Sequence, residues 1–494
     1  MNDNAGEQSL QKTPKLIKGR LNRPDQNWCS SSRGSAPVLQ ERAPVESARE
    51  FVRHVFARGE APCLIYYRGG FYEWLGSHYE ECDAAHLRAK LYKFLDGALT
   101  SKGEPFNPNP HKVNQILDAL QSAVEQNAKR NAAFWIAPGG NNPDHLIACG
   151  NGLLDIETQQ LLPLNPAFFN VNCLPFNYDR NAPTSPKTWM TFLRQLYPGD
   201  EDGKQARFTL QEIFGLMLTP DTRHQKIFMI VGPKRSGKGT IARVLTALLG
   251  KDNVCCPTLA GLSSHFGLSP LIDKRAAIIS DARLGPQTNA HVVAERLLSI
   301  SGEDALTIDR KYREPWTGRL HTRFLILTNE LPRIADSSGA LASRFVLLTM
   351  SNSFYGKEDL DLIDKLLLEL SGILNWSLVG LKRLRERGRF EMPQSSRDAI
   401  QQLEDLGSPV SAFLRDWCEI EKEARITVRE LYDAYIKWSK LEGHKTKSNA
   451  MFGRDLRAIA PLIRVRGRAP DRFYEGIALS KQSQQPYEEK WRSR

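Results

Sequence analysis

The sequence predicts an α/β protein built around a parallel sheet, with a mixed α+β domain before it and a winged helix–turn–helix after it. Three observations support this prediction. A short apolar strand, a glycine-rich turn and a helix follow one another within residues 227–250. Further apolar runs, at 276–280, 324–328 and 345–348, leave room for the crossovers that parallel strands require. Two amphipathic helices and a hairpin then follow near the C-terminus.

The glycine-rich turn has the composition of a phosphate-binding loop. Its glycines let backbone N–H groups approach phosphate oxygens, and the following helix adds a favourable dipole. Lys238 would reach the β- and γ-phosphates. Because Gly239 follows Lys238, the hydroxyl for Mg²⁺ must come from Thr240. The alternative, a tight turn between two core elements, explains the glycines but not the lysine at this spacing. The predicted loop comprises Gly232, Pro233, Lys234, Arg235, Ser236, Gly237, Lys238, Gly239 and Thr240.

Composition excludes several classes of protein. The net charge of +11 indicates a polyanionic partner, with nucleic acid as the first candidate and an anionic membrane surface as the second. No apolar run approaches 18 residues, so we expect no membrane span, and the N-terminus has no signal-peptide pattern. The eight cysteines form no CxxC pair, which predicts a reduced, cytosolic chain without a structural zinc site.

The 494 residues suffice for about three domains. We expect a basic, disordered arm at 1–45, the α+β domain at 46–184, the nucleotide-binding domain at 185–390, the winged helix at 397–480 and a tail at 481–494.

The domain before the phosphate loop contains no recognisable catalytic arrangement. A hairpin is predicted where Gly69-Gly70 separates Leu64–Tyr67 from Phe71–Trp74. Helices are predicted at 78–95 and 113–124. We interpret this domain as a scaffold or a subunit contact.

Polar residues lie next to three of the apolar runs, after two of them and before the third. Asp281 is at the place where Mg²⁺ is held through water, although it could be a solvated strand end. Asn329 could orient the attacking water, or simply cap a turn. Arg344 precedes a strand and could neutralise charge at a neighbouring subunit's nucleotide, or be an ordinary surface arginine.

A basic hairpin is predicted between the second and third runs. Arg310, Lys311 and Tyr312 lie in it, followed by Trp316. Basic residues beside aromatic ones suit a single-stranded backbone whose bases stack, and a solvated hairpin is the alternative.

The C-terminal pattern predicts a helix opened by a capping box at Thr427, a second helix at 448–459 with Met451, Phe452, Leu456 and Ile459 buried, and a hairpin. Its positive charge suits contact with a phosphate backbone, and a protein-docking winged helix is the alternative. The candidate DNA contacts are Arg454, Arg457, Arg464, Arg466 and Arg468.

Four segments resemble motifs of the superfamily 3 helicases: GPKRSGKGT, IISDAR, SGEDALTIDRKYREPW and RFLILTNELPRIADSSGALASRF. More narrowly, they resemble the helicase portion of phage and plasmid primase–helicases, with poxvirus relatives, over about residues 60 to 480. The resemblance implies an AAA+-like ATPase that forms a hexameric ring, moves along single-stranded DNA and unwinds duplexes during replication.

Residue roles follow by motif position. The resemblance makes Lys238 and Thr240 phosphate-loop residues, Asp281 the acid of the second motif, Asn329 the sensor and Arg344 the arginine finger, with Arg310 and Lys311 in the DNA-contacting motif.

Two departures from the family pattern are visible. Ala282-Arg283 follows Asp281, so no adjacent glutamate is present to activate water, and Glu303 is a hypothesis for that role. Nothing resembles a primase active site, which leaves room for a separate primase or replication initiator.

The sequence therefore predicts an ATP- and Mg²⁺-dependent DNA helicase, acting on single-stranded and forked DNA in the cytoplasm of a bacterial or phage-infected cell. A nucleotide-switched DNA-binding or origin-binding regulator is the alternative. A nucleoside-monophosphate kinase, which also carries GKGT, would need no winged helix.

Overall fold

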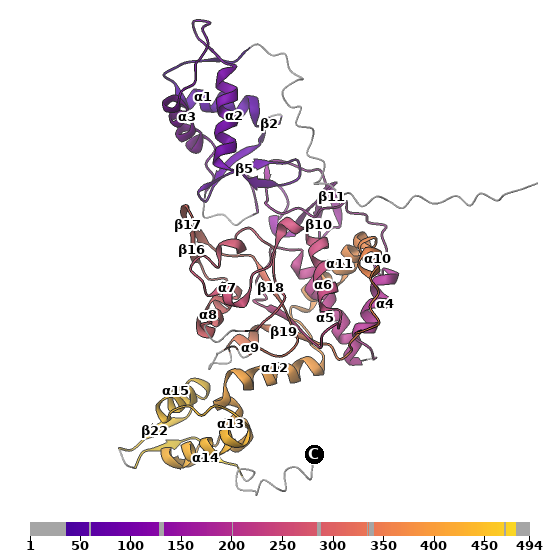
Figure 1. The fold of residues 1–494 in the computed structure, drawn as a ribbon, viewed down its shortest axis with the longest axis vertical. Coiled ribbons are helices and arrows are strands. Elements are labelled where there is room, and N and C mark those ends of the chain that lie inside the picture. The colour runs from indigo at the N-terminus through magenta and orange to yellow at the C-terminus, as the bar shows by residue number, and fades with distance from the viewer. Residues whose placement is uncertain are drawn as a thin grey trace, which may run out of the picture. The chain divides into compact units, whose positions relative to one another are not determined.

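The computed structural model describes residues 36–58, 61–127, 133–199, 201–283, 288–332, 334, 340–468 and 471–480. It consists of two compact units (Figure 1). The first extends to Gln126 and includes Leu164–Ala167, and the second comprises Asn127–Pro163 and everything from Phe168 onward. Most of the predicted arm and the whole predicted tail lie outside the described residues. Residues 38–45 are not an arm, because they contain a strand and the start of a helix.

The first unit is mixed α and β, as predicted. Its antiparallel sheet has the order β4-β5-β6, and β1 pairs in parallel with β7. The elements are β1 (Val38–Leu39), α1 (Pro44–Val55), β2 (Ala57–Arg58), β3 (Ala61–Pro62), β4 (Leu64–Tyr67), β5 (Gly70–Trp74), β6 (Tyr79–Glu81), α2 (Ala84–Asp96), β7 (Leu99–Thr100) and α3 (Pro110–Ala123).

The predicted hairpin at Gly69-Gly70 is confirmed, since Tyr67 pairs with Gly70. The helix predicted from residue 78 begins too early. Tyr79–Glu81 form β6 against β5, and α2 starts only after Asp83, whose side chain accepts the N–H of Ala85 and so caps the helix.

The second unit begins with short strands and two helices that lead into its main sheet. These are β8 (Phe134–Trp135), the 3₁₀ turn Pro143–His145, β9 (Leu146–Cys149), β10 (Gly152–Asp155), β11 (Gln160–Leu162), β12 (Phe168–Phe169), α4 (Lys187–Leu196) and α5 (Glu201–Met217).

A parallel sheet of five strands, ordered β14-β15-β18-β13-β19, forms the centre of this unit. Crossovers and a hairpin connect the strands. The elements are β13 (Ile227–Val231), α6 (Lys238–Leu249), β14 (Val254–Cys255), α7 (Leu259–Leu262), β15 (Ala276–Ile279), α8 (Ala290–Ser301), β16 (Leu306–Arg310), β17 (Arg313–Gly318), β18 (Arg323–Thr328), α9 (Ala340–Arg344) and β19 (Phe345–Thr349).

Helices cover both faces of the sheet, which is why its strands are apolar without alternation. Successive residues of β13 point into different cores: Phe228 and Ile230 join the core of α4, α5, α6 and α11 (Leu370–Arg387), whereas Ile227 and Met229 join that of α7 and α8. Figure 1 shows α5, α6 and α11 on one side of the sheet and α7 and α8 on the other.

Helix α12 begins between the predicted nucleotide-binding domain, 185–390, and the predicted winged helix, 397–480, and it extends into the latter. It spans Gln394–Gly407, and Ala399 and Leu403 are buried in the core that contains Ile227. This helix therefore packs with the sheet. Between β19 and α11 lies α10 (Leu362–Leu367).

Three helices and a three-stranded sheet, ordered β21-β23-β22, follow α12. The predicted capping box is present, with Thr427 and Glu430 bonded reciprocally. Met451, predicted to be buried, is 45% exposed, while Phe452 and Leu456 are fully buried. The elements are α13 (Pro409–Trp417), β20 (Cys418–Glu419), β21 (Arg425–Thr427), α14 (Val428–Leu441), α15 (Asn449–Ile459), β22 (Arg464–Arg466), β23 (Phe473–Glu475) and β24 (Ala478–Leu479).

Across the described ranges, no helix combines the length and the apolar character that crossing a membrane demands.

Candidate functional site

The loop 232–240 joins β13 to α6, and two of its three glycines are required by geometry. Gly237 has φ +91° and sits directly before the first residue of α6. A Cβ on Gly237 would lie 2.7 Å from Leu196 Cδ2, and one on Gly232 would lie 2.7 Å from Met350 Cβ. Larger residues at these two positions would displace the loop. In its present position, the loop can present its backbone N–H groups to an anion, together with the N-terminus of the twelve-residue helix α6.

Lys238 points back over this loop. Its ammonium donates to the carbonyl oxygens of Gly232 at 2.6 Å and Pro233 at 2.7 Å. It also donates to Ser236 Oγ at 3.2 Å and to Asn329 Oδ1 at 3.1 Å. Burial lowers the pKa of Lys238 from its ordinary value. The ammonium is thus held by neutral oxygens, and phosphate oxygens could replace them as acceptors.

Strand register brings three predicted residues to one edge of the sheet. Val231 of β13 pairs with Thr328 of β18, and Ile279 of β15 pairs with Ile326. Because these strands are parallel, the residues that follow them emerge at the same, carboxyl edge. The loop after β13, Asp281 after β15 and Asn329 after β18 therefore meet there.

Asp281 accepts from Arg283, two residues further on. The guanidinium Nε lies 3.0 and 2.9 Å from the two carboxylate oxygens and Nη2 lies 2.6 Å from Oδ2. These bonds to Arg283 hold the pKa of Asp281 below its usual range. Thr240 Oγ1 accepts from Arg243 at 3.4 Å.

These oxygens fit a magnesium ion that keeps most of its water. Among the described residues, no group of three His, Cys, Asp or Glu side chains could enclose a metal. Magnesium commonly binds one or two protein oxygens together with water and substrate phosphates. Thr240 and Asp281 are donors of that kind, and the glycine loop beside them fits the phosphates.

Arg344 lies at the opposite edge. It ends α9 immediately before β19, and the following Phe345 pairs with Ile227, the first residue of β13. β13 has five residues, so the two edges are about 16 Å apart. Within one chain, Arg344 is therefore remote from Lys238.

Gln225 holds Arg344, and the sequence patterns did not single out this glutamine. Its Oε1 accepts from Arg344 Nη1, which also donates to the Ser301 carbonyl at 3.5 Å. Gln225 has φ +53°, a left-handed backbone that is uncommon for residues other than glycine. A conformation of this kind cannot be recognised from residue types alone.

Glu303 also lies at this amino edge of the sheet. Its carboxylate accepts from the Thr222 hydroxyl, in the loop that precedes β13. The hypothesis that Glu303 activates water beside Lys238 of its own chain is therefore wrong, because strand β13 separates the two residues.

The predicted basic hairpin forms from β16 and β17 with a bulge between Ile308 and Arg310. Tyr312 at its tip is 92% exposed and has φ +60°, and Lys311 Nζ lies 5.0 Å from its ring centre. Arg310 donates to the carbonyl of Glu314 at 2.9 Å. Trp316, considered as a second stacking residue, is buried in the sheet core and is not available to a ligand.

The basic residues predicted at the C-terminal module are exposed on α15 and on the segment around β22. Arg454 lies 3.3 Å from the buried Asp455, and Arg466 lies 3.2 Å from Glu475. Arg457, Arg464 and Arg468 are also exposed, so all five can meet a partner from solvent.

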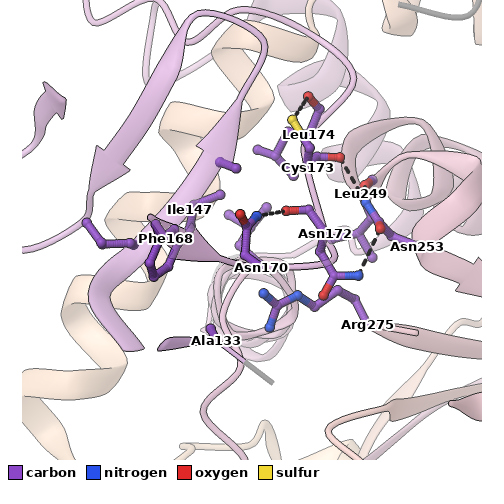
Figure 2. A pocket seen from close by; sticks show the side chains of 13 residues that line it. Ala133, Ile147, Phe168, Asn170, Asn172, Cys173, Leu174, Leu249, Asn253 and Arg275 are labelled. Atoms are coloured by element: carbon purple, nitrogen blue, oxygen red, sulfur yellow. Dashed lines mark hydrogen bonds between the residues drawn. The ribbon is translucent and has the colours of Figure 1, made fainter. Parts of the chain in front are cut away.

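A cavity lies elsewhere in the second unit (Figure 2). Polar side chains that line it form hydrogen bonds between the chain around residue 172 and the residues that precede β14. Asn253 donates to the carbonyl of Cys173 at 2.9 Å and accepts from Asn172 at 2.9 Å. Arg275 extends into the same cavity as Asn170, and burial lowers the pKa of its guanidinium to about 10. Arg275 and Asn253 precede β15 and β14, so this cavity lies away from the carboxyl edge that carries Lys238.

Comparison with known proteins adds three family matches along the chain. Residues 51–198 match a family described as D5 N terminal like, and residues 408–465 match one described as Poxvirus D5 protein-like. Between them, residues 230–344 match a family of unknown function, DUF5906.

One curated relative is the replication protein E1 of European elk papillomavirus. It is 34% identical over 131 residues, which is 26% of this chain and 19% of that protein. The match thus spans about a fifth of the length of the viral protein.

Among solved structures, the apo structure of the NrS-1 C terminal region covers 88% of this chain and 99% of its own, with a TM-score of 0.52 and 14% identity. The A form of the same region covers 88% and 100%, with a TM-score of 0.46 and 12% identity. At these identities the likeness concerns the fold alone.

The two D5-type matches lie before and after the strands of the parallel sheet. These findings identify the chain as a relative of the phage-type primase–helicases.

Proposed function

We propose that this protein is an ATP-dependent DNA helicase or translocase of replication, with an AAA+-like core that works as a hexameric ring. The observation that carries the proposal is the contact between Lys238 and Asn329 at 3.1 Å, on the edge of the sheet that also presents Asp281. A cation, an amide and a carboxylate on adjacent strand ends are the groups that phosphoryl transfer to water requires.

The chain's residues would divide the work at this edge. The N-terminus of α6 and Lys238 bind the β- and γ-phosphates, with phosphate oxygens taking the place of the Gly232 and Pro233 carbonyls as acceptors. Thr240 and Asp281 would hold Mg²⁺, which supplies charge neutralisation on the phosphates. Asn329 orients the attacking water. Asp281 must exchange part of its pairing with Arg283 for this role.

Arg344 completes the site of a neighbouring subunit. Its position at the amino edge, about 16 Å from the loop of its own chain, suits donation in trans and not in cis. A ring in which each carboxyl edge faces the next subunit's amino edge would pair every Lys238 with a foreign Arg344.

DNA contact is assigned to two surfaces. The exposed tip Lys311–Tyr312, with Arg310 behind it, would grip single-stranded DNA, and the C-terminal module would act as a winged helix on the phosphate backbone. Movement requires that the hairpin bind DNA differently in the ATP and ADP states, since a ligand shifts a conformation only by its differential affinity. We also propose that the protein acts on forked DNA in the cytoplasm, together with a separate primase or replication initiator.

The test is steady-state ATP hydrolysis with and without single-stranded DNA, together with strand displacement on a forked duplex. In the wild type, DNA should stimulate hydrolysis and the duplex should be unwound. Lys238→Ala should abolish both activities. Lys251→Ala, which removes an exposed lysine beyond the other end of α6, is the matched control and should leave them unchanged.

Hydrolysis that DNA does not stimulate, without strand displacement, would contradict the helicase and favour a nucleotide-switched DNA-binding protein. No hydrolysis under any of these conditions would refute the ATPase assignment as well.

A further inference from the structure

The carboxyl edge still needs a proton acceptor for the attacking water. Asp281 is followed by Ala282 and Arg283, so no second acid accompanies it. Within its own chain, Glu303 is too far from Lys238, because it lies at the opposite edge of the sheet. A general base must reach the water within hydrogen-bonding distance, so the candidate has to come from the strand ends that surround Lys238.

Most described carboxylates at this edge have a cationic partner of their own. Asp281 accepts from Arg283 Nε at Oδ1 and from Nη2 at Oδ2, and it is assigned to the metal. Glu358, in the loop after β19, lies 3.5 Å from Arg235, and Asp359 lies 2.9 Å from Lys365. Glu330 remains: it is exposed, and it follows the sensor asparagine directly.

The backbone holds Glu330 at a fixed place on this edge. β18 is the middle strand of the sheet, between β15 and β13. Thr328, its buried last residue, donates its hydroxyl to the Glu330 carbonyl at 2.6 Å and accepts the Glu330 N–H at 3.4 Å. Asn329, between them, is fixed to Lys238. The turn thus carries Glu330 out beside the two groups assigned to the γ-phosphate and the water.

We propose that Glu330 is the general base for ATP hydrolysis. As the water oxygen bonds to the γ-phosphorus, the bond from that phosphorus to the β-phosphate oxygen breaks, and ADP departs. The water proton passes to a carboxylate oxygen of Glu330, which then releases it to solvent. This assignment rests on the proposed ATPase function and adds the residue that the second motif lacks.

Glu330→Gln keeps the size of the side chain and removes its basicity. We expect the rate of hydrolysis to fall at least about 100-fold, the ordinary contribution of a general base. Binding of a fluorescent ATP analogue and of single-stranded DNA should stay within about threefold of wild type. Protein incubated with ATP and desalted should carry ATP in the variant and ADP in the wild type. Asp359→Asn, a carboxylate-to-amide change at the same edge, is the control and should hydrolyse normally.

The outcomes separate the two proposals. Normal hydrolysis by Glu330→Gln in a protein that Lys238→Ala inactivates overturns the role of Glu330 alone. If Glu330→Gln loses nucleotide binding as well as hydrolysis, then Glu330 has a structural role, and its assignment as the general base is overturned too. A wild type without hydrolysis overturns the ATPase itself.

Discussion

Arg344 owes its position to one neighbouring residue with an unusual backbone. Gln225 adopts φ +53°, donates its N–H to the Thr222 carbonyl at 2.8 Å, and turns its side chain to Arg344. Its amide nitrogen lies 3.4 Å from the Gly302 carbonyl. The glutamine therefore fixes the guanidinium between the loop before β13 and the end of α8. A residue in a sparsely populated conformation that also holds a proposed catalytic group is a candidate for function.

Gln225→Ala should lower DNA-stimulated ATP hydrolysis about tenfold, because Arg344 loses its orientation but keeps its charge. Arg344→Ala should lower it further, by about 1,000-fold or more, the usual worth of an arginine finger. The Michaelis constant for ATP should change little in Gln225→Ala, since the phosphate loop is untouched. Gln401→Ala, on the exposed side of α12, is the control. Wild-type turnover by Gln225→Ala alongside an inactive Arg344→Ala would refute the positioning role.

Helix α15 presents exposed positive charge that we predict to meet DNA. Arg454 and Arg457 project from this helix into solvent, while Phe452 and Leu456 anchor its other face. With charge on one face and apolar residues on the other, the helix would bind a phosphate backbone without loosening its core.

Replacing both Arg454 and Arg457 with alanine should weaken duplex binding and flatten its salt dependence, by about 0.9 in log–log slope for each phosphate that the protein no longer neutralises. The measurement is a fluorescence-anisotropy titration at several salt concentrations, without nucleotide. Arg429→Ala, 92% exposed at the side chain on α14 of the same module, should leave the slope unchanged. An unchanged slope in the double variant would point to the protein-docking alternative for this module.

The whole molecule is proposed to act only as part of a ring, because each subunit presents Lys238 and Arg344 at opposite edges of its sheet. Subunits of Lys238→Ala and of Arg344→Ala should each be inactive alone. Mixed in equal amounts and allowed to exchange, they should recover about a quarter of wild-type hydrolysis, since one interface in four would pair an intact lysine with an intact arginine. Native mass spectrometry of the mixture would report the ring size in the same experiment.

A mixture as inactive as its components, despite demonstrated subunit exchange, would contradict action in trans. Activity of Arg344→Ala alone would show that this arginine is not needed.

Local patterns in the sequence were enough to predict several elements. The apolar run before Gly232, the helix after Lys238 and the capping box at Thr427 are each set by neighbours within a few residues, and all three are present. The positions of Asp281 and Asn329 could also be predicted locally, since a residue that closely follows a strand lies at that strand's end whatever its neighbours are. Local signals failed where they conflicted, as at residues 79–81, where a strand replaces the predicted start of a helix.

The tertiary structure alone decided which of these residues meet. That Lys238 reaches Asn329, while Glu303 and Arg344 lie across the sheet, depends on the strand order β14-β15-β18-β13-β19. It also decided that Trp316 is buried and Met451 exposed. The physical reason is that strand order and register arise from contacts between residues far apart in the chain, whereas periodicity and capping report only on near neighbours.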